Sequence, residues 1–198
     1  SKEGPTVERI RYYDANGDAQ SLFTTFNVVQ QTQTMGWSTS ATSSARKKAT
    51  ELITKIEDAL DGAPFSGIRC LCGATVWTDL LEDQDAKATY LNTMMAADLR
   101  QDPRLSFQWN GITWERYRGT SAVKVPDAEA YAYPEGVAGL FITRFAPANY
   151  NETVNTLGLP YYAKGEPIKF GKGYELEAQS NPLNLCTRPR AVIKVTKD

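Results

Sequence analysis

The sequence predicts an α+β fold, in which strand pairs and helices occupy separate stretches of one chain. Asn-Gly dipeptides at 16–17 and 110–111 each lie between two β-prone runs, and Asn-Gly is the strongest short signal for a hairpin. Apolar residues at spacings of three and four between 45 and 60 indicate a long amphipathic helix. The last third of the chain returns to short β-prone runs, and we expect its strands to join the opening ribbon.

The opening ribbon is predicted from the runs ERIRYYD and AQSLFTTF, which flank the turn residues DANGD at 14–18. Acidic and amide side chains at alternate positions of this turn also suggest a calcium loop. Such a loop needs a glycine and a glutamate at the positions where this chain has Ala19 and Thr25. The segment is therefore predicted to be a hairpin turn without a metal.

A helix is expected from 41 to 60, after a polar, strand-like stretch at 28–37. Serines and threonines, the preferred N-cap residues, precede it, and Asp61-Gly62 with Pro64 beyond is expected to end it. The basic triplet at 46–48 is interpreted as a solvated helix face. The apolar seam consists of Ala45, Ala49, Leu52, Ile53, Ile56, Ala59 and Leu60.

The remaining elements are predicted from the same periodicities. In the middle of the chain we expect a strand at 68–72, helices at 74–81 and 86–99, and a hairpin of strands 107–109 and 112–117. Further strands are expected at 123–126, 129–133, 140–145, 168–170, 174–179 and 190–196, with a short helix at 149–157. The expected break points are the bend at 62–64 and a loop at 163–173.

Composition argues against several classes of function. The 22 basic and 23 acidic residues give a formal net charge of −1, so the chain lacks the positive field that drives non-specific binding to nucleic acids. No apolar run is close to the length of about 20 residues that a membrane-spanning helix needs, and the N-terminal residues lack the apolar core of a signal peptide. The sequence predicts neither a membrane protein nor a basic DNA-binding protein.

Catalytic and metal-binding side chains are scarce. Histidine is absent from the sequence, which removes the commonest general base and the histidine-activated nucleophiles of most hydrolases. Cys70, Cys72 and Cys186 are too few for a disulfide framework and lack further ligands for zinc or iron. Acidic clusters at 57–61 and 82–85 are interpreted as solvated surface. We expect no enzyme, no cofactor and no metal, with a carboxylate-only enzyme as an alternative.

Two basic motifs match nucleotide-binding or nucleic-acid-binding sites only in part. Gly171-Lys172-Gly173 lacks the spacing of a phosphate-binding loop and is predicted to be a turn. Arg116-Tyr117-Arg118-Gly119 combines basic and aromatic side chains, as sites for single-stranded nucleic acid do. Strand alternation would place Arg116 and Arg118 on one face, which suits a contact with another subunit equally well. The absence of a second such cluster nearby favours the structural interpretation.

The richest aromatic segment is AYAYPEGVAGLFITRFAPANYNETVNTLGLPYYA at 130–163, where aromatic residues alternate with turn-forming prolines and glycines. Together with GIRCLCGATVWTDLL, FQWNGITWERYRG and QSNPLNLCTRPRAVIKV, this segment resembles the tailed-phage major capsid protein E family, the lambda-type coat proteins. The resemblance covers almost the whole chain in order. It implies the Hong Kong 97-type phage capsid fold, which has a peripheral domain with a long spine helix and a β-ribbon, and an α/β axial domain.

The resemblance also implies a division of the chain. Part of the peripheral domain would occupy 1–62, with the spine helix at 41–60. The axial domain would occupy 63–162, and strands in 163–198 would return to the peripheral domain. Members of the family are longer at the N-terminus, so this sequence is expected to be a C-terminal portion that lacks the N-terminal arm and the excursion loop.

The function implied by the resemblance is structural: the major head protein of a tailed bacteriophage or prophage. Such a protein would assemble with itself, as hexamers and pentamers, into an icosahedral shell that encloses DNA without sequence-specific binding. Scaffold or decoration proteins would be further partners, and no membrane would be involved. Its location would be the virion capsid, and the bacterial host cytoplasm during assembly.

Candidate subunit contacts are mostly aromatic and basic residues: Trp114, Arg116, Tyr117, Arg118, Tyr133, Pro134 and Tyr150. The competing hypothesis is a monomeric module that binds carbohydrate or peptide through the aromatic loops at 131–162. That hypothesis predicts ligand-dependent fluorescence and no large particles.

Overall fold

The computed structural model describes residues 11–13, 19–39, 44–90, 106–120 and 124–197. The chain forms two compact units: a sheet unit of residues 1–138 and 188–198, and a ribbon unit of residues 139–187. The boundaries expected from the family resemblance, at 62/63 and 162/163, do not coincide with the limits of these units.

A six-stranded mixed sheet forms the centre of the sheet unit, in the order β3-β12-β7-β4-β6-β5. Its strands are β3 (Gln31–Thr34), β4 (Gly67–Cys72), β5 (Phe107–Trp109), β6 (Ile112–Arg116), β7 (Glu129–Glu135) and β12 (Ile193–Thr196). β4 is parallel to β6 and antiparallel to β7, and β12 is parallel to β3 and antiparallel to β7. Segments from the beginning, middle and end of the chain therefore share one sheet.

One face of this sheet carries the core. Alternate residues of β4, Ile68, Cys70 and Cys72, are buried, and their register partners Trp114 and Ala132 are buried on the same face. These side chains belong to one apolar cluster with the buried faces of helices α2 and α3. The opposite face of the sheet is partly exposed.

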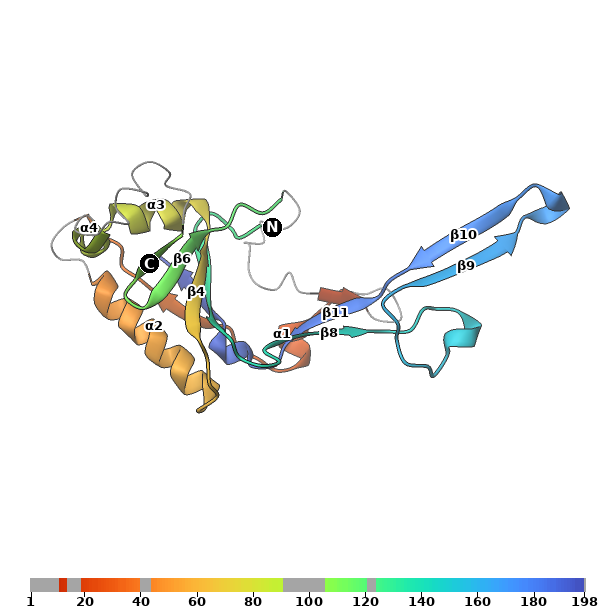
Figure 1. Ribbon diagram of the computed structural model, residues 1–198, viewed down its shortest axis with the longest axis horizontal. Helices are drawn as coiled ribbons and strands as arrows, with labels where there is room; N and C mark the ends of the chain where they lie inside the picture. The colour runs from red at the N-terminus through yellow and green to blue at the C-terminus, as the bar shows by residue number, and fades with distance from the viewer. Residues whose placement is uncertain (1–10, 14–18, 40–43, 91–105, 121–123, 198) are drawn as a thin grey trace. The chain divides into compact units, whose positions relative to one another are not determined.

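Helix α2 (Ala45–Leu60) confirms the predicted amphipathic helix, although residues 41–43 of the expected span lie outside the described residues. It ends as expected, because Asp61 and Gly62 both adopt a left-handed conformation. Figure 1 shows α2 as the longest helix beside the sheet. Its buried residues follow the predicted seam: Ala45, Ala49, Leu52, Ile56 and Leu60.

Two shorter helices, α3 (Ala74–Glu82) and α4 (Gln84–Tyr90), follow β4 as predicted, and residues 91–99 of the expected second helix are outside the described part. Asp83 between them corrects the prediction of a solvated acidic cluster, since its side chain is completely buried. Its carboxylate accepts hydrogen bonds from the backbone N–H groups of Ser38, Asp85 and Ala86. Asp83 therefore caps the start of α4 and joins it to the chain before α2.

The second Asn-Gly turn is confirmed. Asn110 and Gly111, both with positive φ, connect β5 to β6 in a two-residue hairpin. In the opening ribbon β1 (Arg11–Tyr13) pairs with β2 (Ala19–Ser21), and the turn at 14–18 lies outside the described residues. A short helix, α1 (Leu22–Thr25), follows where the strand was expected to continue.

The expectation that the last strand joins this ribbon is wrong. β12 instead lies inside the main sheet, between β3 and β7. Its buried side chains, Ile193 and Val195, complete the apolar layer of that sheet, which offers far more apolar area than a two-stranded ribbon.

The ribbon unit consists of two antiparallel strand pairs (Figure 1). β8 (Phe141–Phe145) pairs with β11 (Pro182–Cys186), and β9 (Tyr162–Pro167) pairs with β10 (Tyr174–Gln179). A 3-10 turn, η2 (Asn151–Thr153), precedes β9, and η3 (Lys169–Gly171) forms the tip of the β9–β10 hairpin. A further 3-10 turn, η4 (Pro189–Ala191), leads into β12 in the sheet unit.

Several predictions for this region are wrong. The expected helix at 149–157 is reduced to η2, and the expected loop at 163–173 contains β9. The expected strand at 168–170 is the hairpin tip, where Phe170 has a φ of 67° that a strand cannot accommodate. Residues 124–126 form no strand, and residue 123 lies outside the described residues. β11 was not predicted, because it is short and contains Pro182 and Asn184, two residue types that are uncommon in strands.

Candidate interaction surface

Two of the predicted subunit contacts lie in the core of the sheet unit. Trp114 is completely buried, its indole N–H donates to the backbone oxygen of Trp109, and its ring packs against those of Trp37 and Trp109. Pro134 on β7 is also fully buried. Side chains without exposed surface cannot contact another subunit, so the structure corrects the assignment of these two residues.

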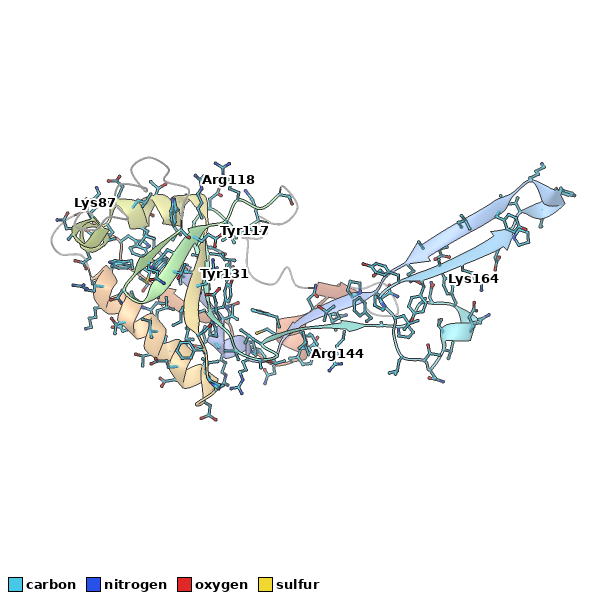
Figure 2. The ribbon with its side chains drawn as sticks, in the orientation of Figure 1. Lys87, Tyr117, Arg118, Tyr131, Arg144 and Lys164 are labelled. Carbon is cyan, nitrogen blue, oxygen red and sulfur yellow. The ribbon has the colours of Figure 1, made fainter. Side chains whose placement is uncertain are left out.

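Basic and aromatic residues do reach the surface where β6 ends. Arg116 is the last residue of β6 and is partly exposed, while Tyr117 is 38% exposed and Arg118 is exposed. Figure 2 shows Tyr117 and Arg118 on the segment that follows β6. Because the strand ends at Arg116, the alternation that was expected to align Arg116 with Arg118 does not extend to Arg118.

The partly exposed face of the sheet carries an ion-pair network. Arg69 on β4 donates to Glu115 on β6 and to Glu135 on β7, at 2.6 Å each. These two hydrogen bonds raise the pKa of the Arg69 guanidinium. Beside it Tyr133 is half-buried, and burial raises the pKa of its hydroxyl. The two ion pairs of Arg69 link β4 to its neighbours β6 and β7.

The ribbon unit has almost no core of its own. All residues from 139 to 187 are described, and Leu140 and Ala148 alone are buried. Large apolar side chains in this unit are instead exposed: Phe141, Val154, Leu157, Leu159, Tyr161, Ile168, Phe170, Tyr174 and Leu176. A folded monomer rarely exposes such a set together, and patches of this kind commonly mark interfaces.

The β9–β10 hairpin separates its side chains into two faces. Register partners share a face, so Ala163, Gly165 and Pro167 lie with Ala178, Leu176 and Tyr174 on what we call the apolar face. The polar face carries Tyr162, Lys164, Glu166, Glu175, Glu177 and Gln179. Period-two alternation in YELEAQ is the sequence signal for this asymmetry, and the prediction of a loop at 163–173 left that strand without its partner β9.

The polar face is partly covered by η2. Lys164 donates a hydrogen bond of 3.2 Å to Glu152, and its ammonium lies 5.1 Å from the ring centroid of Tyr150. Its hydrogen bond to Glu152 raises the pKa of Lys164, and burial raises that of Tyr150. The predicted contact residue Tyr150 is therefore engaged within its own unit.

Cys70 and Cys72 are buried in the core of the sheet unit. Burial raises the pKa of the Cys70 thiol well above its ordinary value, which keeps it protonated and unreactive. No group of three or more potential metal-ligating side chains occurs within the described residues. In the same part of the chain, no helix has the length and apolar character that crossing a membrane requires.

Comparison with known protein families agrees with a structural role. The model of the phage major capsid protein E family matches residues 9–197. The chain belongs to this family. Membership confirms the resemblance in the sequence and places the chain among the structural proteins of the bacteriophage capsid.

Among solved structures, this protein is similar to one described as a candidate capsid protein of a prophage from E. coli CFT073. The two are 12% identical, with a TM-score of 0.45, over 76% of this chain. The chain spans about half, 47%, of that protein's length. The comparison with curated proteins found no match to this sequence.

Proposed function

We propose that this chain is part of the major head protein of a tailed bacteriophage or prophage, which assembles with itself into a closed icosahedral shell around DNA. The observation that carries the proposal is the ribbon unit, where many large apolar side chains are exposed and only Leu140 and Ala148 of the described residues 139–187 are buried. Repetition of one subunit about symmetry axes would cover such surface with neighbouring copies. Family membership supports the same role.

In this proposal the fold is of the Hong Kong 97 type, and hexamers and pentamers are the building units. The group of Arg116, Tyr117 and Arg118, which is exposed in part at Arg116 and more fully at the other two, contacts a neighbouring subunit. DNA is enclosed without sequence-specific contacts, which agrees with the near-zero net charge. Scaffold or decoration proteins bind the assembled shell, which forms in the host cytoplasm and becomes the virion capsid.

Negative-stain electron microscopy tests this function. The full-length gene product is expressed alone and, separately, with its neighbouring head genes. Closed shells, or rings of five and six subunits, are the expected result. Dispersed monomers under both conditions would overturn the proposal and favour the monomeric binding module.

A further inference from the structure

The apolar face of the β9–β10 hairpin is large enough to form the centre of a protein interface. Tyr174 and Leu176 on this face are 75% and 81% exposed, and Tyr161 immediately before β9 is 82% exposed. Together these side chains leave about 400 Å² open, and a standard interface buries about 800 Å² per partner. Between them the Leu176 side chain lies over Gly165, since its Cδ2 would be 2.9 Å from a β-carbon at that position.

The polar face is unsuited to packing against a copy of itself. It presents Glu166, Glu175 and Glu177 against one ammonium, that of Lys164, which already pairs with Glu152. Two such faces in contact would repel one another. The apolar face carries no charged residue, so of the two faces it is the one that suits packing against an identical hairpin.

An exposed aromatic ring lies at one end of the hairpin and a hollow at the other. At the tip, Phe170 is 92% exposed and has a φ of 67°, a left-handed conformation that is strained for a bulky residue. At the base lies a hollow of about 360 Å³, lined by Tyr161, Tyr162, Ala163, Ala178, Gln179 and Ser180. An exposed aromatic ring and an open apolar hollow are the usual components of an interface hot spot.

A two-fold axis brings these components together. Each strand of the hairpin has six residues and spans about 20 Å. When two identical hairpins pack face to face in opposite directions, the tip of each reaches the base of the other. The two-fold rotation therefore places Phe170 of each copy at the hollow of the other copy. Leu176 of each copy then lies near the axis.

We propose that the β9–β10 hairpin pairs through its apolar face with the same hairpin of a second copy of this chain, with Phe170 of each copy seated in the hollow beside Tyr161 of the other. The inference rests on the proposed function, because a shell supplies the second copy. Icosahedral shells contain two-fold axes between subunits, which this contact would occupy.

Disulfide trapping in the full-length protein tests the pairing. Lys169→Cys, which is at the hairpin tip and leaves Phe170 in place, and Ala163→Cys at the base are made separately in a Cys186→Ser background, while Cys70 and Cys72 are buried and stay unreactive. The two single variants are mixed, oxidised and run on non-reducing gels, from both the assembled and the unassembled fraction. We expect a covalent dimer from the mixture and none from either variant alone, because equivalent positions lie at opposite ends of the paired hairpins.

Absence of the dimer in both fractions overturns the pairing, and so does a dimer from Lys169→Cys alone. If shells form but the dimer does not, the proposed function is retained and the pairing is rejected. If the dimer forms but shells do not, the pairing is supported and the proposed shell function is rejected. As a second measurement, Phe170→Ala should lower the yield of particles, or of paired subunits, by about tenfold. Phe26→Ala, at an exposed aromatic outside the ribbon unit, is the matched control and should leave the yield unchanged.

Discussion

Neighbouring aromatic residues in β6 and just beyond it have opposite roles. Trp114 points into the core, where three tryptophan rings contact one another with centroids about 6 Å apart. Tyr117, three residues later, has left the strand and is exposed. Strand parity and the position of the strand's end, both set at single residues, decide whether a ring stabilises the subunit or is available to a partner.

Substitution of these two residues should separate folding from assembly. Trp114→Ala should lower the free energy of unfolding by about 3–5 kcal/mol, because it leaves a large cavity. Tyr117→Ala should change it by about 0.5 kcal/mol or less and should still reduce shell formation. Denaturant unfolding and particle counts by electron microscopy measure the two effects. Unchanged assembly of Tyr117→Ala would remove this residue from the subunit contact.

The pairing of Lys164 with Glu152 should be visible in a pH titration. The pKa of Glu152 is lowered by a backbone hydrogen bond and then by Lys164. Its contribution is therefore present above the ordinary glutamate pKa of about 4.3 and is lost as pH falls through the lowered value. The contribution of Lys164, whose pKa is raised, is lost as pH rises through that raised value. Both are present at neutral pH.

Carbon-detected NMR titration of the Glu152 carboxylate checks this. Lys164→Met should raise the midpoint of Glu152 toward the ordinary value, while Lys169→Met at the hairpin tip should not. Equal midpoints in the wild type and in Lys164→Met would show that the ion pair is not formed in solution.

At the scale of elements, the connections show where backbone contacts require particular residues. β4 passes into α3 at Gly73, beside the chain at 126–127. There the carbonyl of Asp127 accepts hydrogen bonds from the N–H groups of Thr75 and Val76. A backbone carbonyl thus caps α3 and holds the helix at the end of its strand.

Gly73→Ala should break this connection. A β-carbon at this position would lie 2.0 Å from the backbone oxygen of Pro126, so the capping chain must move. We expect a loss of about 2 kcal/mol or more in the free energy of unfolding, measured by urea denaturation. Gly67→Ala in the same strand is the control, since its nearest neighbour would be 3.9 Å away. Equal stability of the two variants would contradict this account of the α3 cap.

At the scale of the whole molecule, the two units differ in where their apolar surface is buried. The sheet unit covers one face of a six-stranded sheet with helices and has a continuous core. The ribbon unit has two-stranded pairs, which are marginally stable alone. A subunit with one self-sufficient unit and one dependent unit suits a protein that completes its folding on assembly.

Hydrogen exchange should report this difference. In unassembled subunits, amides of β4 and β7 should be protected, whereas those of β9 and β10 should exchange at least tenfold faster. In assembled shells the hairpin amides should become protected, and those of the central sheet should change little. Mass spectrometry of peptic fragments measures both states, and equal exchange of the hairpin in the two states would mean that assembly does not cover it.

The sequence by itself determined the elements whose signals are local. The helix of residues 45–60, the strand and helix around Gly73, and the hairpin at Asn110-Gly111 all follow from periodicity, glycine and turn chemistry. The order of the motifs along the chain identified the family.

Only the tertiary structure decided which of these residues are buried and which are exposed. The burial of Trp114, Pro134 and Asp83, and the place of β12 inside the sheet, depend on strands distant in sequence. The apolar face of the β9–β10 hairpin is exposed because no other element of the ribbon unit covers Tyr174 and Leu176. Apolar alternation predicts that a face will be buried, but it does not distinguish a face that the same chain covers from one that another copy covers.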